Sequence, residues 1–165
     1  ILVLIKSGIY IKLTFLPEPA AIALSVLWLL AVTNAFNLID IMDGLSAGTA
    51  MVAAATLLVV AELGGGSTAA TLLAGLAGSC LGFLRYNFEP ARIYMGDTGS
   101  MFLGLLLGAL AMDNAYTRFN PVAALAPALI LGVPLFDMLF VMYVRFRRGN
   151  PIMLGSPVHV ALRLR

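Results

Sequence analysis

Two clusters of polar residues interrupt an otherwise apolar sequence, and both contain side chains of the kinds that bind metal ions and phosphates. The first cluster has a polar residue at every third position: Asn34, Asn37, Asp40 and Asp43. Helical neighbours at i and i+3 lie close together, at about 100° per residue, so this spacing predicts side chains that wind partly around one helix end and face a common cavity. Ordinary helix capping by Asp43 before Gly44 is the alternative.

The second cluster joins two apolar segments and covers residues 85–100, RYNFEPARIYMGDTGS. Its Asp97 is either a helix N-cap that accepts from the amides of Gly99 or Ser100, or a metal ligand. Carboxylates, amides and arginines together suit Mg²⁺ and a diphosphate, because Mg²⁺ is bound through one or two carboxylates plus phosphate oxygens. We therefore predict that Asp40, Asp43 and Asp97 converge beside a divalent cation on one aqueous face.

The apolar segments that must position these clusters are long enough to cross a membrane, since a bilayer core of about 30 Å needs roughly 20 helical residues. Five segments approach that length: Ala20 to Phe36, Leu45 to Leu63, Thr68 to Leu84, Gly99 to Met112 with extension to Tyr116, and Val122 to Val144. Residues 1–16 are left open between a helix end and an interfacial hairpin. The prediction is an all-α, polytopic integral membrane helical bundle with about five transmembrane helices in one domain over residues 1–165.

The composition excludes several classes of protein. Hydrophobic residues make up 61% of the chain, charged residues only 11%, and the mean hydropathy is +1.00, which excludes an ordinary water-soluble domain and makes the lipid bilayer its surroundings. A net charge of +2 is too small for nucleic-acid binding. The single cysteine, Cys80, can form neither an internal disulfide nor a thiolate metal cage.

The arginines predict the orientation in the membrane, because Lys and Arg in short loops are retained on the cytoplasmic side. One side collects Arg85, Arg92, Arg145, Arg147, Arg148, Arg163 and Arg165. The loops near residues 37–45, 85–98 and 145–165 and the C-terminus are therefore predicted to be cytoplasmic, with Arg145, Arg147 and Arg148 as interfacial anchors. Of the acidic residues outside these loops, Glu18, Glu62 and Asp113 are predicted to be solvated helix ends on the outer side.

Two further patterns concern helix packing. Small residues recur at helical spacing in Gly104-x-x-x-Gly108, Gly78-x-x-x-Gly82 and Gly75-x-x-x-Ser79, which predicts close helix contacts in lipid. Asp137 lies eight residues before Arg145, about 12 Å inside the predicted helix end, where a free carboxylate is costly. We therefore predict that Asp137 faces inward, paired or protonated, and supports the site without taking part in the chemistry.

The two clusters resemble the signature motifs of the polyprenyl-phosphate N-acetylhexosamine-1-phosphate transferases (glycosyltransferase family 4). This family includes phospho-N-acetylmuramoyl-pentapeptide transferase and the undecaprenyl-phosphate GlcNAc-1-phosphate transferases. The matching residues are NLID-x-x-DGL-x-AG from Asn37 and NF-x-PA-x-x-YMGDTGS from Asn87, in the family's order. The resemblance implies that the chain from about Ala20 onward is the C-terminal half of a ten- to eleven-helix fold.

The resemblance also implies the reaction and its residues. The phosphate of polyprenyl (undecaprenyl) phosphate would attack the β-phosphorus of a UDP-N-acetylhexosamine, release UMP and leave a lipid diphosphate sugar for cell-envelope polysaccharide or peptidoglycan synthesis at the bacterial inner membrane. The implied catalytic residues are Asp40, Asp43 and Asp97, with Asp97 and Asp40 as ligands of Mg²⁺, and the implied substrate-binding residues are Asn37, Asn87, Tyr94, His159 and Arg163. Mn²⁺ in place of Mg²⁺ and a homodimer are compatible with this assignment.

Two departures from the family pattern qualify the prediction. Family members carry an acidic pair in their N-terminal half, and this sequence has no Asp-Asp pair, so we expect a longer parent chain and little turnover by residues 1–165 alone. The family's His-rich loop is reduced to His159, either a solvated loop histidine or a diphosphate contact assisted by Arg163, which favours a GlcNAc-like donor. An ion-coupled transporter that uses Asp137, or a non-catalytic scaffold, are the alternatives.

Overall fold

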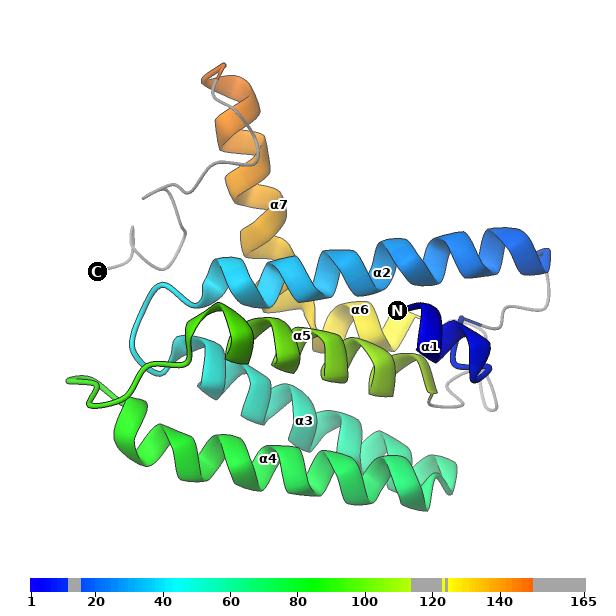
Figure 1. Ribbon diagram of the computed structural model, residues 1–165, viewed down its shortest axis with the longest axis horizontal. Coiled ribbons are helices and arrows are strands. Elements are labelled where there is room, and N and C mark those ends of the chain that lie inside the picture. Colours follow the sequence, from blue (N-terminus) through cyan, green and yellow to red (C-terminus); the bar gives the residue numbers. More distant parts are fainter. Residues whose placement is uncertain (12–15, 114–122, 124, 150–165) are drawn as a thin grey trace.

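The computed structural model describes residues 1–11, 16–113, 123 and 125–149, and this part of the chain contains helices and no strands. The helices are α1 (Leu2–Lys6), α2 (Glu18–Ile39), α3 (Leu45–Gly64), α4 (Ser67–Asn87), α5 (Gly96–Asp113), α6 (Ala126–Ile130) and α7 (Gly132–Arg147). Figure 1 shows α2 to α5 side by side and alternating in direction. The predicted all-α membrane bundle is confirmed.

Three helices, α2, α3 and α4, are long and apolar enough to cross a membrane. About a third of each apolar window is buried inside the structure, so most of its surface faces outward. Large apolar side chains such as Leu27, Val59 and Leu81 lie on these outward faces, where lipid would solvate them. The fourth predicted segment forms α5, which has 18 residues and ends at Asp113; its predicted extension to Tyr116 lies outside the described residues.

The fifth predicted segment is not one helix in its described part, because α6 ends at Ile130 and α7 begins at Gly132. Pro134 explains the break: it has no N–H to donate to the carbonyl of Ile130, and its ring would clash with that carbonyl in a continuous helix. Figure 1 shows α7 running steeply away from the direction of α2 to α5. The proline therefore redirects the chain after the main bundle.

The N-terminal segment is joined to the bundle through a buried hydroxyl. The backbone N–H of Ile11 donates to Oγ of Ser25 at 2.8 Å, and this hydroxyl donates to the carbonyl of Ala21 at 2.7 Å. Ser25 lies on α2 and is fully buried. The described part of residues 1–16 is thus a short helix followed by a segment that is bonded to α2.

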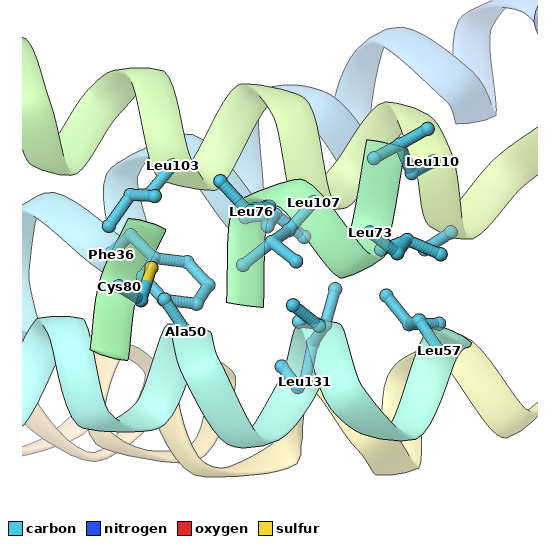
Figure 2. Packing of buried hydrophobic residues seen from close by; sticks show 14 of the residues in the cluster. Phe36, Ala50, Leu57, Leu73, Leu76, Cys80, Leu103, Leu107, Leu110 and Leu131 are labelled. Carbon is cyan, nitrogen blue, oxygen red and sulfur yellow. The ribbon is translucent and has the colours of Figure 1, made fainter. Parts of the chain in front are cut away.

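The core is apolar and draws on every helix of the bundle. Phe36 of α2, Leu57 of α3, Leu73 of α4, Leu107 of α5 and Leu131 at the α6–α7 junction are all fully buried, and Figure 2 shows these side chains pointing toward one another. Since lipid tails are as apolar as leucine, this close packing, more than removal from water, holds the helices together. The core thereby fixes the helix ends that carry the polar clusters.

Helices α2 and α5 approach each other closely at Gly104. A Cβ atom at this glycine would lie 2.7 Å from Cα of Thr33 and 2.9 Å from the carbonyl oxygen of Val32. One turn further along α5, the carbonyl of Gly108 accepts from Nε1 of Trp28 at 3.1 Å. The packing predicted for the Gly104-x-x-x-Gly108 pattern is confirmed, and it sets the separation of these two helices.

The same pattern on α4 does not pack in the described structure. Cβ atoms built at Gly75, Gly78 and Gly82 would meet nothing within 4 Å, and Ser79 donates only to the carbonyl of Gly75 in its own helix. The prediction of close contacts there is therefore wrong for this part of the chain. The four small residues face outward because α4 packs on α3 through other residues, including Leu73 and Cys80.

Candidate functional site

The two predicted clusters meet at one end of the bundle. Helix α2 ends at Ile39, Asp40 is its C-cap residue, and residues 41–44 lead into α3. Residues 88–95 connect α4 to α5 at the same end, as Figure 1 shows. The first cluster is therefore not one continuous helix end: Asn34 and Asn37 lie on α2, whereas Asp43 lies in the connection.

A glycine with a left-handed backbone conformation lies at the start of α3, and another lies at the start of α5. Gly44, with φ of 74°, is the N-cap residue of α3, and Gly96, with φ of 65°, is the first residue of α5. Residues with a Cβ rarely adopt these angles, so glycine is required at both turns. Gly44 places the α2–α3 connection against α4, and Gly96 places Asp97 in the first turn of α5.

A hydrogen bond between the motifs joins α2 to α5. Nδ2 of Asn37 donates to Oδ1 of Asp97 at 3.1 Å and also lies 3.3 Å from Oγ of the buried Ser100. Asp97 lies inside the first turn of α5, where the positive end of the helix dipole favours a carboxylate. The Asp97 side chain therefore accepts from Asn37, a residue 60 positions away on another helix, and not from the amides of Gly99 or Ser100 in an N-cap bond.

Asp40 and Asp97 form a like-charged pair at this end. Burial raises the pKa of the Asp40 carboxyl above its ordinary value, and the negative charge of Asp97 raises it further. A divalent cation between the two carboxylates would remove this repulsion, and a hard cation such as Mg²⁺ is typically bound by one or two carboxylates plus phosphate oxygens. The donor set therefore fits the predicted ion.

Asp43 does not join them in a three-carboxylate site. Among the described residues no group of three or more His, Cys, Asp or Glu side chains is placed to hold a metal ion. Oδ2 of Asp43 instead accepts from the backbone N–H of Ala91 at 2.9 Å. The expected convergence of three aspartates is wrong because the chain turns after Asp40 and directs Asp43 toward the α4–α5 connection.

Asn87 also bonds to the connections between the helices. It is only 5% exposed, its Oδ1 accepts from the N–H of Gly44 at 3.0 Å, and its Nδ2 donates to the carbonyl of Ile93 at 2.9 Å. Ser46 of α3 adds a third link, because its hydroxyl lies 3.8 Å from Sδ of Met95. Ser46 and Ser100 received no role from the sequence, since only the folded structure shows what their hydroxyls contact.

The remaining predicted site residues differ in their surroundings. Tyr94 is 75% exposed, so its ring is accessible. His159 and Arg163 lie outside the described residues. Glu18, Glu62 and Asp113 are exposed at the opposite end of the bundle, as predicted for solvated helix ends.

The buried face of α7 confirms one prediction and corrects another. Asp137 and Arg145 are each 5% exposed, and with Pro134 and Val141 they form the buried stripe of this helix. The inward position predicted for Asp137 is confirmed. Arg145, predicted to be an interfacial anchor, is buried because its spacing from Val141 and Asp137 places it on the same face, whereas Arg147 and Arg148 are exposed.

Replacing Asp40 with asparagine should raise the melting temperature of the metal-free protein at neutral pH by a few degrees, because the substitution removes a half-buried charge that Asp97 repels. A carboxyl whose pKa is raised on folding contributes stability below its ordinary pKa, and this contribution is lost as the pH rises through the raised value. The advantage of Asp40→Asn should therefore vanish in acid. Thermal unfolding in EDTA at several pH values measures the difference in melting temperature between the variant and the wild type. A wild type that is more stable than Asp40→Asn at neutral pH would contradict the repulsion between Asp40 and Asp97.

Comparison with known proteins finds one family. The family described as "Glycosyl transferase family 4" matches residues 2–115. Over 144 residues, 87% of this chain, the sequence is 42% identical to a probable undecaprenyl-phosphate N-acetylglucosaminyl 1-phosphate transferase of Bacillus subtilis, of which it covers 40%.

Two other relatives carry related names. A phospho-N-acetylmuramoyl-pentapeptide-transferase of Chlamydia trachomatis is 52% identical over 93 residues, 54% of this chain and 28% of that protein. A decaprenyl-phosphate N-acetylglucosaminephosphotransferase of Mycobacterium tuberculosis is 33% identical over 168 residues, 90% of this chain and 42% of that protein. The chain thus spans less than half the length of the curated relatives it matches.

Proposed function

Because the chain belongs to glycosyl transferase family 4, we propose that it supplies the metal-binding end of an enzyme that transfers an N-acetylhexosamine 1-phosphate from a UDP-sugar to polyprenyl phosphate and releases UMP. The observation that carries the proposal is the Asn37–Asp97 hydrogen bond, which brings the two motifs together beside Asp40. The names of the relatives support the lipid acceptor, and membership of this family argues against the ion-coupled transporter.

Asp97 and Asp40 are the proposed ligands of Mg²⁺, and the same two carboxylates are compatible with Mn²⁺. Asn37 donates to Oδ1 of Asp97, so it orients the carboxylate and leaves Oδ2 for the ion. When bound, the cation supplies neutralisation of the diphosphate and of the departing UMP. Asp40, Asp97 and Asn37 would hold the positive charge of the cation at a fixed place between α2 and α5, where the reacting groups are brought together.

Tyr94 is proposed to stack on the uracil ring, because its accessible aromatic face lies in the connection that precedes Asp97. His159 and Arg163 remain proposed diphosphate contacts from the C-terminal segment. The GlcNAc-like donor is preferred over a UDP-MurNAc-pentapeptide because the sequence carries His159 in place of a cluster of histidines.

The site is proposed to face the cytoplasm at the inner membrane. Arg85 at the end of α4 and Arg92 in the α4–α5 connection lie on the same end of the bundle as Asp40 and Asp97, which agrees with retention of cations on the inner side. This side is also where a nucleotide donor would be available to the exposed Asp97 and Tyr94. A homodimer stays a prediction.

The test is transfer by the intact protein in lipid nanodiscs, with labelled UDP-GlcNAc and undecaprenyl phosphate. We expect a labelled lipid product and an equal amount of UMP in the presence of Mg²⁺, loss of both in EDTA, and recovery when Mg²⁺ is restored. UDP-glucose in place of UDP-GlcNAc is the donor control. A lipid product that forms equally well in EDTA, or UMP release that does not require the lipid phosphate, would contradict the proposal.

A further inference from the structure

We propose that Asn87 and Asp43 are positioning residues that lock the α2–α3 connection to the α4–α5 connection and so set the spacing between the Asp40–Asp97 pair and Tyr94. This positioning role replaces the catalytic role that the family resemblance implied for Asp43 and the substrate-binding role that it implied for Asn87, because both side chains bond to the backbone of the connections. The inference deepens the proposed function and rests on it for its effect on activity, whereas the lock itself is a property of the fold.

The amide of Asn87 has one bonding partner in each connection. Its Oδ1 accepts from the N–H of Gly44, which follows the first motif's aspartates, and its Nδ2 donates to the carbonyl of Ile93, the residue before Tyr94. Gly44 and Asn87 are both buried. Breaking either hydrogen bond would leave a buried backbone N–H or carbonyl group without a partner, which is costly, so this bridge is stable.

Asp43 adds a second bridge, in which a side chain of the α2–α3 connection bonds to the backbone of the α4–α5 connection. Its Oδ2 accepts from the N–H of Ala91 at 2.9 Å, and a carboxylate acceptor strengthens such a bond. The connection between these bridges is itself closed, because the N–H of Arg92 donates to the carbonyl of Tyr86 at 2.8 Å. Residues 86–93 therefore form a folded turn that is bonded to residues 43 and 44.

The two bridges determine where Tyr94 lies. On one side of it, Ile93 is held by Asn87, and on the other side Met95 is contacted by Ser46 at the start of α3. The tyrosine ring is exposed while its neighbours in the chain are tied down. Loss of the bridges should therefore displace Tyr94 relative to Asp40, and a misplacement of about 1 Å can reduce catalysis by about 100-fold.

Conservative and truncating substitutions at Asp43 separate positioning from metal binding. Asp43→Asn keeps an oxygen acceptor for Ala91 and removes the charge, so we expect it to recover most of the kcat/KM that Asp43→Ala loses and to keep the wild-type dependence on Mg²⁺ concentration. Asp43→Ala removes the acceptor, and we expect at least about a tenfold loss in kcat/KM, mainly through the KM for the UDP-sugar. If Asp43→Asn is as defective as Asp43→Ala, the charge is required and the inference is overturned.

The rate of amide hydrogen exchange of the intact protein in nanodiscs measures whether the two connections are held together, and it does not depend on enzymatic activity. Asn87→Ala should accelerate exchange in the peptide that contains Gly44, and Asp43→Ala should accelerate it in residues 88–95, whereas Asp43→Asn should not. The matched control is Asn34→Ala, because the amide of Asn34 donates only to the carbonyl of Leu30 in its own helix. Unchanged exchange in both truncated variants would refute the lock.

These two measurements also separate the possible failures. If the transfer assay shows no Mg²⁺-dependent reaction but exchange accelerates as stated, the proposed function fails and the lock stands. If the wild type transfers but exchange does not respond, the lock fails alone. Should Asn87→Ala not fold, the exposed Asp43 still supplies the test, because its side chain bonds at the surface.

Discussion

Replacement of Asp97 by asparagine is expected to lower Mg²⁺-dependent transfer by at least about 100-fold, because it removes one of the two carboxylates proposed to hold the ion. The substitution keeps an amide oxygen that Asn37 can still donate to, so the contact between α2 and α5 should persist. The measurement is the initial rate at which labelled UMP exchanges into UDP-GlcNAc in the presence of polyprenyl phosphate.

Asp113→Asn is the matched control for this experiment. Asp113 is an exposed aspartate on the same helix, at the end opposite to Asp97, and its replacement should leave the exchange rate unchanged. A second measurement separates ligand loss from damage to the fold: Mg²⁺ should raise the melting temperature of the wild type and of Asp113→Asn but not that of Asp97→Asn. Exchange that survives in Asp97→Asn would refute the metal assignment.

Substituting alanine at Gly104 is expected to destabilise the protein by about 1–3 kcal/mol and to reduce transfer, although Gly104 lies about 10 Å along α5 from Asp97. The new Cβ would lie 2.7 Å from Cα of Thr33 and 2.9 Å from the carbonyl oxygen of Val32. Both atoms belong to the backbone of α2, so the strain can be relieved only by moving one helix away from the other.

Such a movement reaches the site because the same two helices carry its residues. Asn37 lies on α2 one turn beyond Thr33, and its bond to Asp97 is 3.1 Å long, which leaves little room for separation of the helices. We therefore expect a lower melting temperature together with a loss of activity in Gly104→Ala.

The matched control is Gly78→Ala on α4, where a new Cβ meets nothing within 4 Å. This variant should keep full activity and gain up to about 1 kcal/mol from the higher helix propensity of alanine. If Gly104→Ala instead behaves like Gly78→Ala in both stability and activity, the close approach of α2 and α5 does not control the site.

The sequence by itself determined the class of the protein and the elements of its site. Apolar length predicted the helices, since a membrane-crossing helix is defined by local composition. Glu18, Glu62 and Asp113 were correctly assigned to the opposite end of the bundle from Asp40 and Asp97, because each lies at a helix end and the helix ends can be located from the local sequence. The hydropathy pattern predicted one continuous helix from Val122 to Val144, although Pro134 in the sequence already indicated the break between α6 and α7.

Only the tertiary structure decided which residues act on one another. Three small-residue patterns look alike in the sequence, and within the described part of the chain only Gly104-x-x-x-Gly108 faces another helix, because spacing defines a helix face but not its partner. Likewise, Asp40, Asp43 and Asp97 carry the same carboxylate group, and their residue type alone does not say which of them lie together. The turn at Gly44 directs one of them to a backbone amide and leaves the other two as a repelling pair, a distinction that depends on contacts between residues far apart in the chain.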